Sequence, residues 1–251
     1  MIVGIIQARM GSTRLAGKVL LPIGELTLLE HCYNRLQHST KVDRWILATT
    51  TEPADDVIET FCKEYNISCY RGSEWDVLDR FYQAIQHFNL TPTTVVRICC
   101  DNPTHHGEVV DFAIREFQRY QVDYFSNGNQ PPTYSQDGIT SEVFSYNALE
   151  QAWKESTMLS EREHVTPYIK TSGSFKCAWR KYSDNYQFKL SVDTPADLEL
   201  SKRVFQELGN DFTIEELIVF LTKNKNLLSI NEESIINEGY QKSLKEDRKV
   251  K

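Results

Sequence analysis

Short apolar runs alternate with amphipathic stretches over the first hundred residues of the chain. Ile2–Ile6 is β-branched except for Gly4, which is typical of a strand buried on both faces. Further strands are predicted at residues 45–48, 67–70 and 94–98, and helices at 28–37, 53–65 and 73–87. We expect Ser73 to cap the last of these helices, with Asp76 completing a capping box. The alternation favours a parallel sheet with helices on its faces.

The pattern becomes less regular after a helix that is predicted at residues 107–120. Later helices are expected at 147–155, 161–166, 195–208 and 211–222, and strands at 142–146 and 188–192. Ser160 is the expected cap of the helix that Pro167 should end or kink. Residues 127–140 are rich in Gly, Pro, Asn and Ser, which predicts a loop, and the charged C-terminal end is expected to fray.

Composition narrows the class of protein. Hydrophobic residues make up 40% of the 251 residues and charged residues 25%, as in ordinary globular proteins. No apolar run approaches the roughly 20 residues that cross a bilayer, and the N-terminus lacks the features of a secretory signal. The six cysteines form no CxxC pair, so we expect reduced thiols in a cytoplasmic protein. A net charge of −7 argues against nucleic acid as a partner.

A cationic loop, residues 7–18 with the sequence QARMGSTRLAGK, directly follows the first strand. No acidic residue occurs in residues 1–24, whereas Arg9, Arg14 and Lys18 lie close together in the sequence. Ligands of open α/β sheets bind at the carboxyl ends of the strands, and glycine-containing backbone can form a nest for an anion. The loop therefore favours phosphate binding over the alternative of a glycine-rich turn with surface arginines.

Two known phosphate-binding motifs do not match this loop. Five residues separate Gly11 from Gly17, one more than a Walker A loop has, and Val19 follows Lys18 where that motif has Ser or Thr. The dinucleotide pattern GxGxxG is also absent. The sequence thus predicts a phosphate-binding loop of another kind.

Two aspartates follow predicted strands. Asp101 comes after the strand at 94–98 and Asp193 after the strand at 188–192, so both are expected at the carboxyl edge of the sheet. Two carboxylates beside a phosphate loop can hold Mg²⁺, which keeps several waters and needs few protein ligands. The alternative is that each aspartate only caps the element that follows it.

Three further polar residues are candidates for contact with a substrate. Asp137 and Glu142 follow the predicted loop and suit a polar ligand, although a turn and a solvated strand edge explain them equally well. His164 can donate a hydrogen bond to a substrate oxygen, or can serve only as a structural hydrogen bonder. His105 and His106 have no third residue at metal-ligand spacing.

Seven segments taken together resemble the cytidylyltransferases that include the CMP-Kdo and CMP-sialic acid synthetases, and within them the spore-coat polysaccharide (SpsF-type) branch. These segments are residues 5–20, 48–62, 70–84, 95–103, 137–153, 160–169 and 190–200. Residues 237–247 also resemble this family. A single such motif is weak evidence. Seven motifs in the same order, which together cover nearly the whole chain, are strong evidence.

The resemblance implies a GT-A-like, Rossmann-like three-layer α/β sandwich with a mixed, mostly parallel sheet, and a homodimer. It implies one nucleotidyltransferase domain over residues 1–230, in which about 127–180 form an insertion for acceptor binding or dimerisation. Residues 231–251 are then a partly frayed C-terminal segment. The implied ligands are CTP, a sugar-type acceptor and Mg²⁺, with no membrane contact.

The resemblance also implies a role for each candidate residue. The nucleotide contacts implied are Gln7, Ala8, Arg9, Met10, Gly11, Ser12, Arg14, Lys18, Arg71 and Asp101. Among these, Arg14, Lys18 and Asp101 are implied to be catalytic, and Asp101 with Asp193 to hold the metal. The acceptor contacts implied are Asp137, Glu142, Arg162 and His164.

This chain departs from the family pattern at three places. Ala16 stands where the family has Pro, and His105–His106 replace a typical Ile-Asp stretch. Cys99–Cys100 replace the residues before Asp101, one of which helps to recognise cytosine in the Kdo branch. The hypothesis is transfer of CMP from CTP to a sugar or sugar acid, with release of pyrophosphate. The alternatives are a GT-A glycosyltransferase that uses a nucleotide sugar, and a nucleotide-binding module without catalysis.

Overall fold

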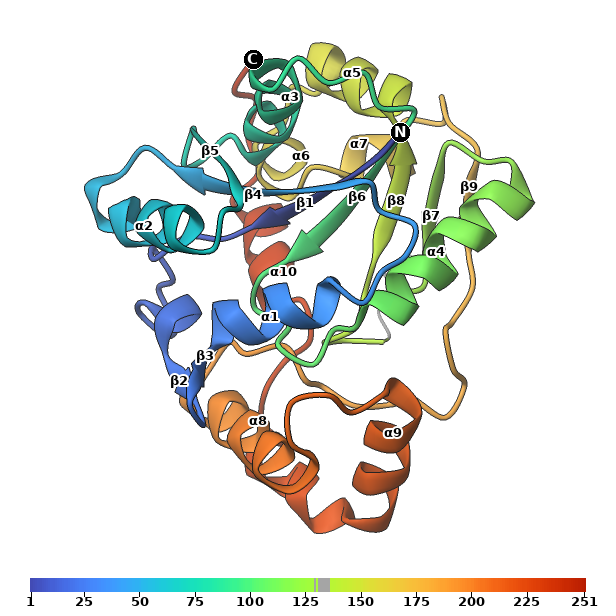
Figure 1. Ribbon diagram of the computed structural model, residues 1–251. Helices are drawn as coiled ribbons and strands as arrows, with labels where there is room; N and C mark the ends of the chain where they lie inside the picture. Colours follow the sequence, from blue (N-terminus) through green and yellow to red (C-terminus); the bar gives the residue numbers. More distant parts are fainter. Residues whose placement is uncertain (129, 131–135) are drawn as a thin grey trace.

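The computed structural model describes residues 1–128, 130 and 136–251, so part of the loop expected at 127–140 lies outside the described residues. A seven-stranded sheet with the order β5-β4-β1-β6-β8-β7-β9 forms its centre (Figure 1). Its strands are β1 (Ile2–Gln7), β4 (Arg44–Thr50), β5 (Ser68–Gly72), β6 (Thr94–Cys99), β7 (Tyr124–Ser126), β8 (Glu142–Ser145) and β9 (Cys177–Trp179). Only β8 among these seven runs antiparallel to its neighbours, so the sheet is mixed and mostly parallel, as expected.

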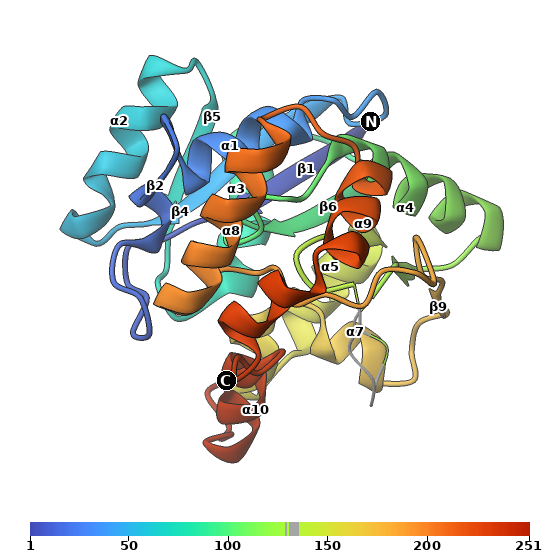
Figure 2. The same cartoon turned by 90° about the horizontal axis from the view of Figure 1, so that it is seen from below.

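Helices cover both faces of this sheet, which confirms the predicted three-layer α/β sandwich (Figures 1 and 2). One layer consists of α1 (Leu28–Leu36), α2 (Asp56–Glu64), α4 (Gly107–Tyr120), α8 (Pro195–Leu208) and α9 (Ile214–Lys223). The other consists of α3 (Val77–His87), α5 (Tyr146–Glu155), α6 (Leu159–His164) and α7 (Pro167–Thr171). Neighbouring strand residues serve opposite cores: Ile5 packs with the second layer and Ile6 with the first.

The remaining elements are short. They are the hairpin β2 (Pro22–Ile23) and β3 (Leu26–Thr27), the 3₁₀ turns η1 (Lys18–Leu20), η2 (Pro53–Asp55) and η3 (Lys225–Asn231), and α10 (Glu238–Lys245). No helix in the described part of the chain combines the length and the apolar character that a membrane crossing requires.

Two predicted helix caps are wrong. Asp76 rather than Ser73 caps α3, because its carboxylate accepts from the backbone N–H of Asp79 at 2.9 Å, while the Ser73 hydroxyl accepts from Asp76 N–H. Ser160 lies within α6, where the carboxylate of Glu161 reaches back to the N–H of Met158. In both places an acidic side chain provides the stronger, charge-assisted cap.

The strand predicted at residues 188–192 is also wrong, since this segment joins no ladder of the sheet. Its backbone donors are used elsewhere. The carboxylate of Asp137 accepts from the N–H groups of Leu190 and Ser191 at 2.8 and 2.7 Å. The N–H of Val192 donates to the carbonyl of Asp101 at 2.8 Å. The segment is therefore held by the Asp137 carboxylate and by one backbone hydrogen bond to Asp101, and it still brings Asp193 close to Asp101.

The C-terminal segment is tied down, in contrast to the frayed end that its charge indicates. We call residues 232–250 the C-terminal strap. Before it, Asn231 donates to Asp197 at 2.8 Å. At its far end, Ser160 binds the carboxylate of Asp247, and Val250 N–H donates to the carbonyl of Thr157. Figure 1 shows the strap crossing the molecule from the α8–α9 end to the end that carries α3.

Gly4 allows the two central strands to pack. It pairs with Trp45 across β1 and β4, and a Cβ atom at position 4 would lie 2.3 Å from the Trp45 ring. The absence of a side chain at this position is therefore a packing requirement and not a source of flexibility.

We predict that Gly4→Ala lowers the free energy of unfolding by about 2 kcal/mol, the usual cost of overpacking a core. Urea denaturation of the wild type and the variant measures this loss. In a Trp45→Val background the same substitution should cost much less, because the clashing ring is gone. Equal costs in the two backgrounds would contradict the packing explanation.

Candidate active site

A cleft of about 860 Å³ opens at the carboxyl ends of β1 and β6. These neighbours are where the strand order reverses, since β4 and β5 lie on one side of β1 and β6 on the other. The cleft is lined by residues from the loop after β1, from β6 and the turn after it, from segments 137–142, 163–170 and 191–193, and from strap residues 235–246. Segments far apart in sequence therefore meet in one cavity.

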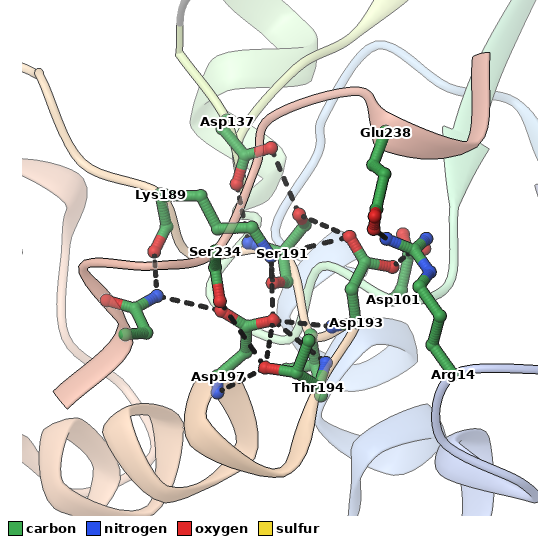
Figure 3. Close-up of polar contacts among 12 residues, drawn as sticks. Arg14, Asp101, Asp137, Lys189, Ser191, Asp193, Thr194, Asp197, Ser234 and Glu238 are labelled. Atoms are coloured by element: carbon green, nitrogen blue, oxygen red, sulfur yellow. Dashed lines mark hydrogen bonds and ion pairs between the residues drawn. The ribbon is translucent and has the colours of Figure 1, made fainter. Parts of the chain in front are cut away.

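The ammonium group of Lys18 joins the two predicted metal ligands. Its Nζ lies 2.9 Å from Oδ2 of Asp101 and 2.9 Å from Oδ1 of Asp193, and it donates to the carbonyl of Val192 at 2.7 Å. Only 11% of the Lys18 side chain is exposed. Figure 3 shows Asp101 and Asp193 together beside Arg14. The structure thus brings together the loop and the two aspartates predicted to hold a metal.

Asp193 is surrounded by positive charge. Besides Lys18, Arg14 contacts its Oδ1 at 2.8 Å and Lys189 its Oδ2 at 3.4 Å. Burial opposes the charge of Asp193, but Lys18, Lys189 and Arg14 outweigh it and lower the pKa of this carboxyl. Burial likewise opposes the charge of Lys18, yet the two aspartates raise its pKa. Lys18 and Asp193 are therefore both charged at neutral pH.

The two carboxylates suit a divalent cation. They already hold one cation, the Lys18 ammonium, between them, and the side chain of Asp101 is 28% exposed to the cleft. Within the described residues no three His, Cys, Asp or Glu side chains form a metal cluster. Mg²⁺ keeps several waters and takes one or two carboxylates with substrate phosphates, so a donor pair fits it better than a closed cage.

Most residues of the predicted loop line the cleft. They are Gln7, Ala8, Arg9, Gly11, Ser12, Arg14 and Lys18. Met10 does not: its side chain packs on the hydrophobic core and its N–H donates to the carboxylate of Asp55 at 2.7 Å. Gly17 adopts a positive φ of 63° and turns the chain into η1, which places Lys18.

Two predicted contact residues do not line the cleft. Arg71 donates to the carboxylate of Glu59 and to the carbonyl of Thr50. Arg162 forms a buried ion pair with Asp76 at 2.6 Å. The geometry therefore lends no support to a direct ligand contact by Arg71 or Arg162, because both guanidinium groups are used within the fold.

The other predicted acceptor residues line the cleft. Asp137 holds residues 190–191 as described above, and burial raises its pKa. Glu142 is buried and contacts Arg97, Lys170 at 3.4 Å and Thr166 at 2.7 Å. Burial opposes its charge, but Lys170 and Arg97 lower the pKa of Glu142. Asp137 is thus a positioning residue, and Glu142 belongs to a buried charge cluster.

Sequence reasoning did not single out four charged residues that line the cleft, Arg80, Arg97, Lys170 and Glu238, although the resemblance implies that residues 72–80 lie near the base and ribose. Arg80 is 2% exposed, and its Nε has no hydrogen-bond partner among the described residues. Burial, with the charge of Arg9, lowers the pKa of Arg80 to about 10. Arg97 carried a signal in the sequence, since it interrupts the apolar run of a strand predicted to be buried. The other three lie on helices, where a charged residue is unremarkable.

The sheet order, the cationic loop and the paired carboxylates define an α/β nucleotidyltransferase. The chain matches the family model described as Cytidylyltransferase over residues 3–234, and it belongs to this family, as the resemblance predicts. Protein MJ1063 of Methanocaldococcus jannaschii is 40% identical over 238 residues, which are 92% of this chain and 94% of the relative.

Two further relatives support this assignment. The spore coat polysaccharide biosynthesis protein SpsF of Bacillus subtilis is 33% identical over 231 residues, which are 88% of this chain and 93% of SpsF. The solved structure of a cytidylyltransferase from Leptospira borgpetersenii has a TM-score of 0.83 at 29% identity. It matches 94% of this chain and 99% of its own. The chain is therefore similar to these proteins over nearly its full length.

We predict that stability falls as the pH decreases from 7 to 5, because buried histidines are neutral in the folded chain. Burial lowers the pKa of His105 to about 3, of His106 to about 4 and of His164 to about 3. In the unfolded chain they take up protons below about pH 6.5, so stability is complete above that pH and is lost on acidification. The expected slope is ~1.4 kcal/mol per pH unit for each such histidine.

Urea unfolding at pH 7, 6 and 5 measures this slope. A His105→Gln variant should show a shallower dependence, because one of the groups that take up a proton on unfolding is removed. A midpoint that stays constant or rises at pH 5 would contradict the prediction.

Proposed function

We propose that this protein transfers CMP from CTP to a sugar acid or a related sugar, with release of pyrophosphate, in the synthesis of a surface polysaccharide or glycan. The observation that carries this proposal is the meeting of Arg14 and Lys18 with Asp101 and Asp193 in one cleft. Membership of the cytidylyltransferase family supports CTP as the donor. The cytoplasmic location and the homodimer stay predictions.

The loop after β1 is the proposed triphosphate site. Arg9, Arg14 and Lys18 line the cleft and supply positive charge where the phosphates would bind. Lys18 lies on a flexible stem between two carboxylates, so an arriving triphosphate can draw its ammonium away from them. The same cation then neutralises the ligand and exposes the aspartate oxygens.

Asp101 and Asp193 are the proposed holders of Mg²⁺. These two carboxylates would hold Mg²⁺, which would supply positive charge for the phosphates and would lower the pKa of an oxygen nucleophile. In the proposed reaction an acceptor oxygen forms a bond to the α-phosphorus, and the bond from this phosphorus to the pyrophosphate oxygen breaks. Arg14 and Lys18 stabilise the charge that develops on the leaving group.

The acceptor side is proposed to bind an anionic group. Arg97, Lys170 and Glu142 form a buried cluster with two cations and one carboxylate. Burial lowers the pKa of Lys170, as expected for a cation with an incomplete set of anionic partners. A carboxylate or phosphate of the acceptor would balance this excess charge, which favours a sugar acid over a neutral sugar.

Pyrophosphate release tests the proposal directly. Purified protein with Mg²⁺ is incubated with each of the four nucleoside triphosphates and with a panel of sugar acids, neutral sugars and sugar phosphates. Release that requires CTP and an anionic acceptor supports the proposal. Release with a different nucleotide would reject cytosine specificity, and no release with any pair would reject the enzyme.

We predict that Asp101→Asn lowers the rate of pyrophosphate release at least tenfold while the protein stays folded. The amide keeps the size of the side chain but removes the negative charge that the metal needs. Asp184→Asn, at an exposed position, is the matched control and should keep full activity. Circular dichroism verifies folding, and a near-normal rate in folded Asp101→Asn would reject the metal assignment.

We predict that Lys170→Met raises the KM for an anionic acceptor by about tenfold, because it removes a buried cation that is worth a charge-assisted hydrogen bond. Glu142 keeps Arg97 as its partner, so the fold should survive. The KM for CTP should not change. Lys176→Met, at an exposed position, controls for loss of charge alone. An equal rise in both KM values would count against an acceptor role.

A further inference from the structure

The C-terminal strap forms one wall of the cleft. Residues 235–243 and 245–246 line it, whereas the family match ends at residue 234. The charge pair between Glu238 and Arg14, at 2.9 Å, ties the strap to the phosphate loop. Figure 3 shows Glu238 extending from the strap toward Arg14. The strap residues that form this wall therefore lie outside residues 3–234, the part of the chain that the family model matches.

The strap also contacts His164, at the acceptor side of the cleft. Nε2 of His164 lies 2.9 Å from the hydroxyl of Ser243, and the His164 ring lies edge-on to Tyr240 with centroids 4.9 Å apart. The Ser243 hydroxyl donates to the carboxylate of Glu163 at 2.7 Å and approaches the carbonyl of Gly239 at 3.1 Å. His164 is thus joined to a carboxylate through a single hydroxyl group.

The protons of this chain of groups can be assigned. A hydroxyl has one proton, and both Glu163 and the Gly239 carbonyl can only accept. The contacts of Ser243 to Glu163 and to His164 can both be hydrogen bonds only if the Ser243 proton goes to Glu163 and Ser243 accepts from Nε2 of His164. This arrangement places the imidazole proton on Nε2. No hydrogen bond to Nδ1 of His164 is found among the described residues.

The surroundings of His164 keep this ring neutral. The ring is largely buried, with 23% of its side chain exposed, and the cations of Arg97 and Lys170 oppose a further positive charge. A neutral imidazole with a proton on Nε2 has an unprotonated Nδ1, which is a hydrogen-bond acceptor. A substrate group that meets this nitrogen must bring its own proton.

We propose that Ser243 of the C-terminal strap is a positioning residue that holds His164 in the Nε2–H tautomer, so that Nδ1 accepts a hydrogen bond from a hydroxyl of the acceptor. This inference rests on the proposed function, in that the acceptor is a hydroxyl-bearing sugar. It reverses the sequence-based expectation that His164 donates to a substrate oxygen, because the single N–H is already committed to Ser243. The strap thus selects acceptors that present a hydroxyl group to Nδ1 of His164.

The tautomer can be observed without any substrate. Nitrogen-15 spectra of protein labelled in its histidines separate protonated from unprotonated ring nitrogens, and loss of a signal set in His164→Gln assigns His164. At pH 7 the wild type should show protonated Nε2 and unprotonated Nδ1. Ser243→Ala should shift both nitrogens toward a mixture of tautomers, and Ser243→Thr, which keeps the hydroxyl, should restore the wild-type pattern.

Kinetics test the contact with the acceptor. Ser243→Ala should raise the KM for the acceptor by about fivefold, the worth of one hydrogen bond, with the KM for CTP unchanged. Ser243→Thr should recover most of this loss. Ser229→Ala, an exposed serine on η3 that donates to a backbone carbonyl, is the matched control and should behave as the wild type.

The possible outcomes separate this inference from the proposed function. A protonated Nδ1 in the wild type, or an unchanged spectrum in Ser243→Ala, would overturn the tautomer assignment. Equal rises of both KM values with a lowered melting temperature would show a structural role only and would also overturn it. If the wild type releases no pyrophosphate with any acceptor, the proposed function and the hydroxyl contact both fail, while the spectra still decide the tautomer.

Discussion

The active site depends on one ammonium group held between two carboxylates. Lys18 contacts Asp101, which follows β6, and Asp193, which precedes α8, and its positive charge lies between these two like charges. The contact links the first loop to positions 83 and 175 residues later in the chain.

Two further carboxylates, Asp137 and Asp197, hold the segment that carries Asp193 in place. Asp137 fastens residues 190–191, and buried Asp197 accepts from Lys189 and from the backbone of Asp193. Lys189 and Asn231 lower the pKa of Asp197 to about 2, although burial opposes its charge. Hydrogen bonds to side chains thus replace the backbone hydrogen bonds of a strand ladder. The segment that carries Asp193 can therefore lie at the carboxyl ends of the strands without joining the sheet.

Several features could be read from the sequence because they depend on local pattern. The run before Gln7, the alternation up to residue 98 and the helix at 107–120 follow from apolar periodicity, and the cationic loop is visible in the residues themselves. The caps of α3 and α6 were misplaced because a serine and a nearby acidic residue compete for the same N–H groups. The strand at 188–192 was misassigned because alternation shows an extended chain but not its partners.

The sequence by itself determined the α/β class and the cationic loop after the first strand, since each depends on residues close together in the chain. It also singled out Asp101 and Asp193, although the strand predicted before Asp193 is wrong. Only the tertiary structure showed that Arg71 and Arg162 form ion pairs within the fold, that Arg97 and Lys170 meet at Glu142 beside the cleft, and that the strap brings Ser243 to His164. The physical reason is that a charged side chain can be satisfied by any partner within a few ångströms. Which partner a charged side chain finds depends on how segments distant in sequence pack together. The local sequence pattern does not predict this packing.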